Sequence, residues 1–229
     1  MKDAETPASA DMLRIGRQLR CPAGEHGREV ARKMALSNQS MIDATFATLR
    51  VDRPGCLLEL GHGDGVHIGA WMAQHPELSC VGLEISPDMR DAAAAANAAW
   101  VEQGRARFQL YDGGEWPTGA PFSPPGVDYV VTVNTVYFWA DPLAVLRRLR
   151  GIMRGSGVLA LGFAHREFMA NLPFTREGFT FYEVEQLRQL VAAAGWAEVE
   201  VESFSEHIPG ARPGETQLRK FSVIRAVAR

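Results

Sequence analysis

The sequence predicts a doubly wound α/β fold in which strands and helices alternate along most of the chain. Apolar runs of strand length alternate with helical segments from residue 56 to residue 194. A glycine-rich loop joins the first of these strands to the helix that follows it. Repeated β–α units form a parallel sheet, because right-handed crossovers place the helices on its faces. We therefore expect one sheet covered by helices.

Length and composition are those of a globular domain. The 229 residues are 46% hydrophobic and 22% charged, with a net charge of −3. A chain of this size buries a core without disulfides or metals, and its charge argues against a nucleic-acid partner. Three cysteines without CxxC spacing favour a reducing compartment. We see neither a signal peptide nor an apolar run of about 18 residues, so we expect a cytoplasmic protein without a membrane span.

The first 50 residues are predicted to form a helical cap. Residues 1–10 are small and polar, and we expect them to be disordered. From residue 11 onward the apolar residues recur at helical spacing, with an interruption near Pro22. The sheet domain is expected to occupy residues 51–229.

Three strands and two helices are expected in the first half of this domain. Ser86 is a favourable N-cap with proline after it, and its helix is expected to reach Trp100. The other helix begins near Val66. The strands are predicted at 56–60, 79–84 and 107–111.

The second half is expected to end in an antiparallel hairpin. The fourth strand is almost entirely apolar, as a strand buried on both faces must be. Asp141 and the proline after it open a helix that is expected to reach Met153 and to end at the turn 155–157. No helix separates the last two strands, so they should run antiparallel. The remaining strands are predicted at 127–133, 158–163, 197–202 and 221–227, and a helix at 182–194.

The most informative segment is the Glu-Leu-Gly-His-Gly-Asp-Gly loop at residues 59–65. In doubly wound folds, ligands bind outside the carboxyl ends of the strands. Glu84 ends the next strand, 19 residues after Gly65. A carboxylate there can accept two hydrogen bonds from a ribose diol, which indicates an adenosine-containing ligand. A dinucleotide-binding loop would need Gly or Ala where Val66 stands.

This segment resembles the first motif of class I S-adenosylmethionine-dependent methyltransferases, and the resemblance extends from about residue 55 to the C-terminus. Asp112 after the third strand, the glycine turn at 155–157 and the terminal hairpin resemble further features of that family. The resemblance implies a seven-stranded sheet of order 3-2-1-4-5-7-6 with strand 7 antiparallel. It also implies S-adenosylmethionine as cofactor and S-adenosylhomocysteine as product.

The resemblance further implies which residues bind the cofactor. Three loop glycines would shape the site around the methionine part, and Glu59 would brace the loop or reach the amino group through water. His62 would face the cofactor carboxylate or solvent. Glu84 would hold the ribose, and Asp112 would accept from the adenine amino group. The whole expected set is Glu59, Gly61, His62, Gly63, Gly65, Glu84, Ile85, Asp112, Gly113 and Asn134.

Three residues are candidates for catalysis or for contact with the acceptor. Asn134 ends the fourth strand, where this family lines the site between cofactor and substrate. His165, just past the fifth strand, is the candidate general base, because imidazole titrates near neutral pH. Tyr137 is the expected substrate contact, and Trp139 the expected core member. Metal-dependent methylation would need acids where Asn134 and His165 stand, so we expect no metal.

The acceptor is expected to be a small, apolar or aromatic molecule. The segment 19–27 and the helix after it should cover the site and exclude water, and Phe-rich residues 168–181 should form a second wall. Similarity to quinone-biosynthesis and natural-product methyltransferases favours carbon or oxygen as the acceptor atom. Two alternatives stay open, a nicotinamide-dependent oxidoreductase and a non-catalytic S-adenosylmethionine-binding partner subunit. The sequence is compatible with an oligomer.

Overall fold

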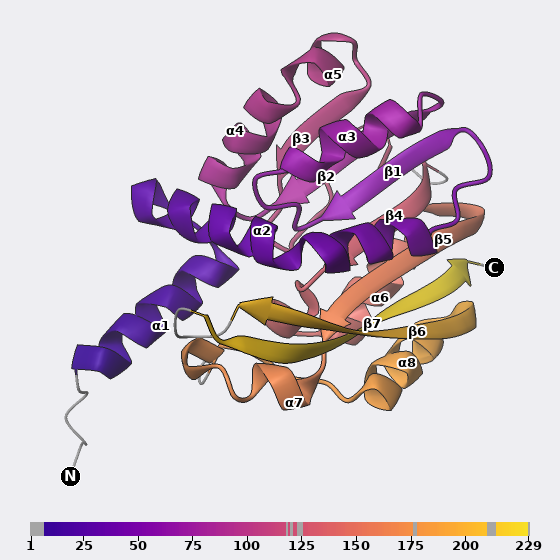
Figure 1. Ribbon diagram of the computed structural model, residues 1–229. Coiled ribbons are helices and arrows are strands. Elements are labelled where there is room, and N and C mark those ends of the chain that lie inside the picture. The colour runs from indigo at the N-terminus through magenta and orange to yellow at the C-terminus, as the bar shows by residue number, and fades with distance from the viewer. Residues whose placement is uncertain are drawn as a thin grey trace.

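The computed structural model describes residues 7–117, 119, 121–122, 126–175, 178–209 and 214–228, which form a seven-stranded sheet of order β3-β2-β1-β4-β5-β7-β6 (Figure 1). Strands β1 to β5 run parallel, and β7 runs antiparallel to both of its neighbours. The predicted strand order and terminal hairpin are therefore confirmed. The strands are β1 (Gly55–Leu60), β2 (Leu78–Glu84), β3 (Ala106–Leu110), β4 (Val127–Val133), β5 (Met153–Ala164), β6 (Trp196–Pro209) and β7 (Thr216–Ala228).

Helices cover both faces of the sheet. In Figure 1, α2 and α3 lie in front of it, and α6 and α8 lie behind it. Strand β4 lies between these layers and is buried over most of its length, as its apolar sequence predicts. The helices are α1 (Pro7–Arg20), α2 (Gly24–Thr48), α3 (Val66–Gln74), α4 (Pro87–Ala96), α5 (Ala98–Glu102), α6 (Pro142–Gly151), α7 (Arg166–Met169) and α8 (Val184–Ala193), with short 3₁₀ turns η1 (Val136–Phe138) and η2 (Pro173–Thr175).

Two helices begin with the caps that the sequence predicts. Ser86 and Asp141 each accept a hydrogen bond from the backbone N–H three residues on, at 3.2 and 2.9 Å, and proline follows each. The helix expected to reach Trp100 is interrupted at Asn97. The Asn97 side chain donates to the carbonyl oxygens of Gly65 and Ala93, both at 2.9 Å, which ties the end of α4 to the glycine loop.

The boundary between α6 and β5 differs from the prediction. Met153 pairs with Val127, so this methionine begins the strand instead of ending the helix. The next pair along the ladder is Tyr129 with Val158, so residues 154–157 of β5 face a single residue of β4. The expected glycine turn is therefore an irregularity within β5, with Ser156 at a φ of 65°.

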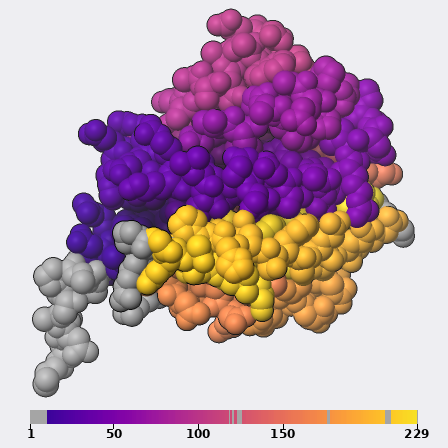
Figure 2. Space-filling view, in the orientation of Figure 1, coloured from indigo at the N-terminus to yellow at the C-terminus, as the bar shows by residue number. Residues whose placement is uncertain are grey.

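Helix α2 is part of the core as well as a cap. Its second half buries Met41, Ile42 and Phe46 against the sheet, and a Cβ on Gly162 would overlap Thr45, so helix and strand approach closely. Figure 2 shows α2 as a continuous band between the α3–α5 region and the β6–β7 hairpin. Helix α1 begins at Pro7, earlier than expected, and residues 1–6 lie outside the described part of the chain. None of the described helices is long and apolar enough to cross a membrane.

The terminal hairpin is longer than the sequence predicts. Strands β6 and β7 stay paired from Trp196 and Ala228 out to Pro209 and Thr216. Many side chains in this outer part are polar and exposed, so it lacks the apolar run by which we placed the strands. The extension carries Ile208 and Arg219 to the carboxyl edge of the parallel strands.

Candidate functional site

One large cavity opens at the carboxyl edge of the parallel strands. Its volume is about 580 Å³, within the usual range for small-molecule sites. The ends of β1, β2 and β4, the α1–α2 junction, the segment after β5 and the outer hairpin all contribute to its wall. Residues predicted for the cofactor lie in this wall, namely Gly61, Gly63, Glu84, Ile85, Asp112, Gly113 and Asn134.

The glycine loop requires glycine for two separate reasons. Gly61, Gly63 and Gly65 have φ values of 75°, 59° and 62°, in the left-handed region that glycine tolerates best. At Gly61 space is limiting as well, because a Cβ there would overlap the side chain of Thr135. Nothing lies within 4 Å of a Cβ on Gly63. The loop backbone is thus open toward the cavity at Gly63 and packed closely at Gly61.

Glu84 is a buried carboxylate held in place by backbone amides. One of its oxygens accepts from the N–H groups of Ile85 and Ser86 at 2.9 and 3.0 Å, and the other accepts from Gly63 at 3.1 Å. The residue is 6% exposed and lines the cavity. A carboxylate has about four lone-pair sites and three are taken here, so about one remains for a hydroxyl of a ligand diol. This arrangement fits the predicted role in holding a ribose.

A second polar group lies beyond β3. One Asp112 oxygen accepts from the Gly114 N–H at 2.9 Å, which leaves the other oxygen to a ligand. Tyr111 lines the same wall, and its buried hydroxyl has no hydrogen-bond partner among the described residues. Its ring stacks on Trp116 at 4.7 Å, and burial raises the pKa of its phenol. Tyr111 was expected only as the end of a strand, so sequence reasoning missed it.

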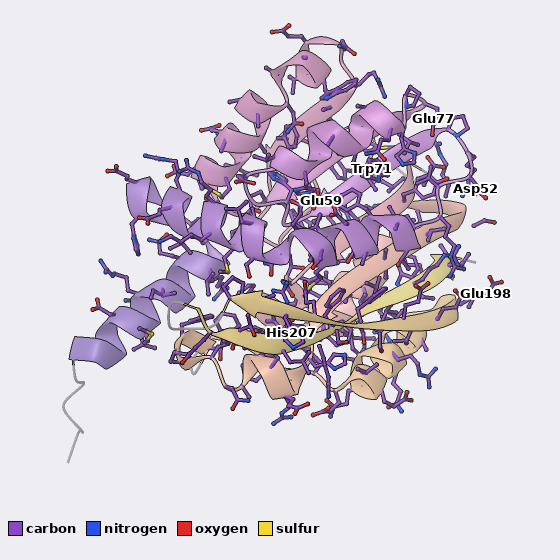
Figure 3. The ribbon with its side chains drawn as sticks, in the orientation of Figure 1. Asp52, Glu59, Trp71, Glu77, Glu198 and His207 are labelled. Carbon is purple, nitrogen blue, oxygen red and sulfur yellow. The ribbon has the colours of Figure 1, made fainter. Side chains whose placement is uncertain are left out.

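Glu59 lies beneath the glycine loop, paired with a histidine. His67 Nε2 is 2.9 Å from both Glu59 oxygens, and the side chains are 9% and 3% exposed. Burial opposes protonation of His67, but the neighbouring Glu59 carboxylate, their hydrogen bond, Asp64 and Asp43 outweigh it and raise its pKa. Both side chains border a smaller cavity of about 130 Å³ beside the loop. Figure 3 labels Glu59 where α2 crosses β1.

His62 does not face the large cavity. Its ring is 3% exposed and packs edge-on against Phe108, with 5.1 Å between centroids. Nδ1–H donates to the Gly63 carbonyl at 2.7 Å, and burial lowers the pKa of the ring. Of the two directions expected for His62, toward the cofactor carboxylate or toward solvent, its burial contradicts the second. His62 supports the loop from below, because its side chain lies against Gly82 of β2.

Two aromatic residues of the segment after β4, Tyr137 and Trp139, both line the large cavity. Tyr137 is 2% exposed, and its hydroxyl accepts from the Ala164 N–H at 2.6 Å and lies 3.0 Å from Asn134 Oδ1. Burial raises the pKa of this phenol far above its ordinary value. Tyr137 therefore joins the ends of β4 and β5. Trp139, expected in the core, is only partly buried and lines the cavity, because the η1 turn points Tyr137 inward.

The candidate base His165 lies outside the cavity wall. Its Nε2 is 2.8 Å from Ser222 Oγ on β7, and its backbone N–H donates to Lys220. Burial and the charge of Lys220 lower its pKa. The side chain thus faces β7, while its neighbour Ala164 lines the cavity. No histidine is among the described residues that line the large cavity.

The far end of the cavity is mainly apolar. Phe168, Phe174 and Phe179 line it, so the predicted aromatic wall borders the site. On α2, Met34 borders the cavity, whereas Met41 is fully buried. Several other residues of the cavity wall are polar or belong to the terminal hairpin. They are Ser37, Asn38, Ile208, Pro209, Gln217 and Arg219.

The comparisons with known sequences concern the middle of the chain. Residues 58–159, somewhat less than half of the chain, match a family model described as a methyltransferase domain. A trans-aconitate 2-methyltransferase from Methylobacterium radiotolerans is 28% identical over 117 residues. That match spans 51% of this chain but only 40% of the relative's length.

The comparisons with solved structures concern the fold. A Thermotoga maritima S-adenosylmethionine-dependent methyltransferase has a TM-score of 0.63 at 17% identity, over 95% of this chain and 100% of that one. Phosphoethanolamine N-methyltransferase 2 of Haemonchus contortus, in complex with S-adenosylmethionine, has a TM-score of 0.58 at 15% identity. The latter likeness covers 81% of this chain and 52% of that one.

Proposed function

We propose that the chain is a class I S-adenosylmethionine-dependent methyltransferase and that it transfers the methyl group to carbon or oxygen of a small, mainly apolar acceptor. S-adenosylmethionine is the cofactor of this family. The expected cofactor residues are proposed here with one change, since His62 supports the loop from below. The division into a cap at residues 1–50 and a methyltransferase domain at 51–229 is likewise proposed.

A single observation carries this proposal. One cavity of about 580 Å³ joins the glycine loop and Glu84 to a pocket lined by Phe168, Phe174 and Phe179. A volume of this size holds a ligand the size of the cofactor together with a small partner. The wall thus combines the predicted cofactor residues with aromatic rings, which suits a cavity that holds two different molecules.

The chemistry that we propose depends mainly on positioning. The cofactor supplies a methyl group that its sulfonium already activates. Glu84 and the glycine loop fix one reactant, and the cap residues Leu19 and Pro22 help to close the cavity and exclude water. Tyr137 ties the ends of β4 and β5 together, and so holds Asn134 at a φ of 56° beside the cavity. Such fixed geometry is worth an effective molarity of about 10⁵ M or more.

The residues of the cavity wall also indicate which kind of acceptor atom receives the methyl group. Since His165 faces β7, no described histidine is placed to take a proton from the acceptor. A nucleophile that is already anionic near neutral pH, such as a carboxylate or a stabilised carbanion, needs no such help. The curated relative named for trans-aconitate supports an acidic acceptor of this kind. We therefore favour O- or C-methylation without a histidine base.

Calorimetric titration with S-adenosylmethionine, S-adenosylhomocysteine and NADH tests the cofactor. We expect micromolar binding of the first two and none of NADH. Glu84→Gln should weaken binding about tenfold or more, because hydrogen bonds to a charged group are worth about 1.5–3 kcal/mol. The matched control is Glu77→Gln, which lies just before the other end of β2 and away from the cavity (Figure 3). Binding of NADH alone would overturn the proposal.

A turnover assay separates an enzyme from a binding module. The purified protein is incubated with S-adenosylmethionine and a panel of small acids, and release of S-adenosylhomocysteine is measured by mass spectrometry. We expect release with at least one acid. Tight cofactor binding without release for any acceptor class would favour the partner-subunit alternative.

A further inference from the structure

A buried arginine lies in the wall at the acceptor end of the cavity. Arg219 is 3% exposed and lines the cavity. Its Nε and Nη2 donate to the same Glu206 oxygen at 2.9 and 2.7 Å. Nη1 donates to Asn38 Oδ1 at 2.7 Å, and Nη2 donates to the Ser37 carbonyl at 2.6 Å. A guanidinium so firmly held keeps one orientation toward the cavity.

Counting donors shows what remains for a ligand. A guanidinium has five N–H groups; Glu206 takes two, Asn38 one and Ser37 one. One N–H on Nη1 is left without a partner among the described residues. Because arginine cannot accept a hydrogen bond, Asn38 must present its oxygen to Arg219 and its NH₂ group away from it. Asn38 also lines the cavity, so two neighbouring donors are available there.

The surroundings make this pair of donors stand out. Most of the nearby wall is apolar, with Phe168, Met169 and Ile208 in it. Hydrogen bonds in such a low-dielectric setting are stronger than in water. Glu84 and Asp112 in the same wall are assigned to the cofactor, so Arg219 and Asn38 remain as donors for the acceptor.

We propose that Arg219 and Asn38 form the site that binds a carboxylate group of the acceptor. Nη1–H of Arg219 and Nδ2–H of Asn38 would each donate to one oxygen, and the apolar wall would hold the body of the molecule. This proposal rests on the proposed function and narrows its substrate class to small apolar carboxylic acids. Glu206 offsets the charge of the guanidinium, so donor geometry, more than net charge, selects the acid.

Matched acids and amides test the proposal on the unaltered protein. Cinnamate and cinnamamide form one pair, and octanoate and octanamide form the other. Each compound is titrated into protein saturated with S-adenosylhomocysteine, so that no transfer takes place. We expect at least one acid to bind about tenfold more tightly than its amide, since charge-assisted hydrogen bonds are about twice as strong as neutral ones.

The variant Asn38→Asp sharpens this test. Asp keeps an acceptor for Arg219 but removes the two N–H donors and adds a negative charge facing the cavity. Acid binding should fall about tenfold or more, while amide binding changes much less. The control is Gln39→Glu, which adds the same charge one residue on, at an exposed position outside the cavity wall.

The possible results distinguish failure of the carboxylate site from failure of the proposed function. If neither acid binds more tightly than its amide, or if Asn38→Asp leaves acid binding unchanged, the carboxylate site is refuted. If S-adenosylhomocysteine fails to bind in the first place, the proposed function itself is refuted. The acid–amide comparison needs no variant, so it decides the question even if Asn38→Asp does not fold.

Discussion

The buried pair of Glu59 and His67 gives the sharpest prediction for stability. Replacing His67 with Ala leaves the Glu59 carboxylate buried without its partner. The carboxylate is 3% exposed, and both of its oxygens are 2.9 Å from the histidine nitrogen. On the other side of the imidazole, Phe46 of α2 packs edge-on at 5.4 Å between ring centroids.

The loss of stability expected for His67→Ala can be estimated from the burial of Glu59. Removing one member of a buried ion pair costs about 3–5 kcal/mol. For a domain of this length, each kcal/mol lowers the melting temperature by about 2–4 °C. We therefore expect His67→Ala to lower it by about 6–20 °C. His67→Gln keeps a neutral donor for Glu59 and should cost only about 1–2 kcal/mol.

The pair also predicts a pH dependence. Burial opposes the protonated form, but Glu59, its hydrogen bond and nearby Asp64 and Asp43 raise the pKa of His67 overall. A raised pKa in the folded state adds stability that is complete below the unfolded value of about 6.5. This contribution is lost as the pH rises through the folded pKa. The stability difference between wild type and His67→Gln should therefore shrink as the pH rises above about 6.5.

Urea unfolding, followed by tryptophan fluorescence at several pH values, measures these differences. The control is His75→Gln, a histidine just beyond the same helix whose carboxylate partner Glu77 lies further away, at 3.6 Å, with more exposed side chains. A His67→Ala protein as stable as wild type near neutral pH would refute the reasoning. So would a difference between wild type and His67→Gln that does not change with pH.

Three further predictions concern the large cavity. Gly61→Ala should weaken cofactor binding in calorimetry more than Gly63→Ala does, because both positions have positive φ but only the first adds an overlap with Thr135. Tyr137→Phe should lower the free energy of unfolding in urea by about 1 kcal/mol, because it leaves the Ala164 N–H with only its longer hydrogen bond to Asn134 Oδ1 at 3.3 Å. It should leave the pH–rate profile unchanged, since the phenol does not ionise in the working range. His165→Gln should leave the rate of methyl transfer unchanged, because that side chain contacts β7.

Much of the fold was predictable because local signals agree with one another. Apolar runs or apolar–polar alternation located all seven strands, and Ser86 and Asp141 located two helix starts by a side-chain cap followed by proline. The ends of helices and strands were less predictable where tertiary contacts determine them. Asn97 ends α4 by bonding across to Gly65, and no propensity encodes that contact. Met153 joins β5 because Val127 pairs with it.

The same distinction between local signals and tertiary contacts applies to the candidate site. Backbone position was predictable, so Gly61, Glu84 and Asp112 lie where the loop and strand ends place them. Side-chain direction was not predictable past a strand end, because the chain leaves the regular alternation there. His165 accordingly turns toward β7 instead of the cavity. Arg219 was missed because it lies outside the predicted strand 221–227, and its burial depends on α2 and Glu206.

Two carboxylates lie next to the glycine loop, and we propose that both help to hold it in the conformation that binds the cofactor. Glu84 accepts from the Gly63 N–H on the cavity side, whereas Glu59 lies beneath and is fixed by His67. A loop with three left-handed glycines has high conformational entropy when free, so its order must come from such contacts. Any change that frees Glu59 should therefore weaken cofactor binding through disorder of the loop, even where Glu84 is untouched. Preorganisation lowers the entropic cost of binding, and in this chain His67, outside the glycine motif, supplies part of it.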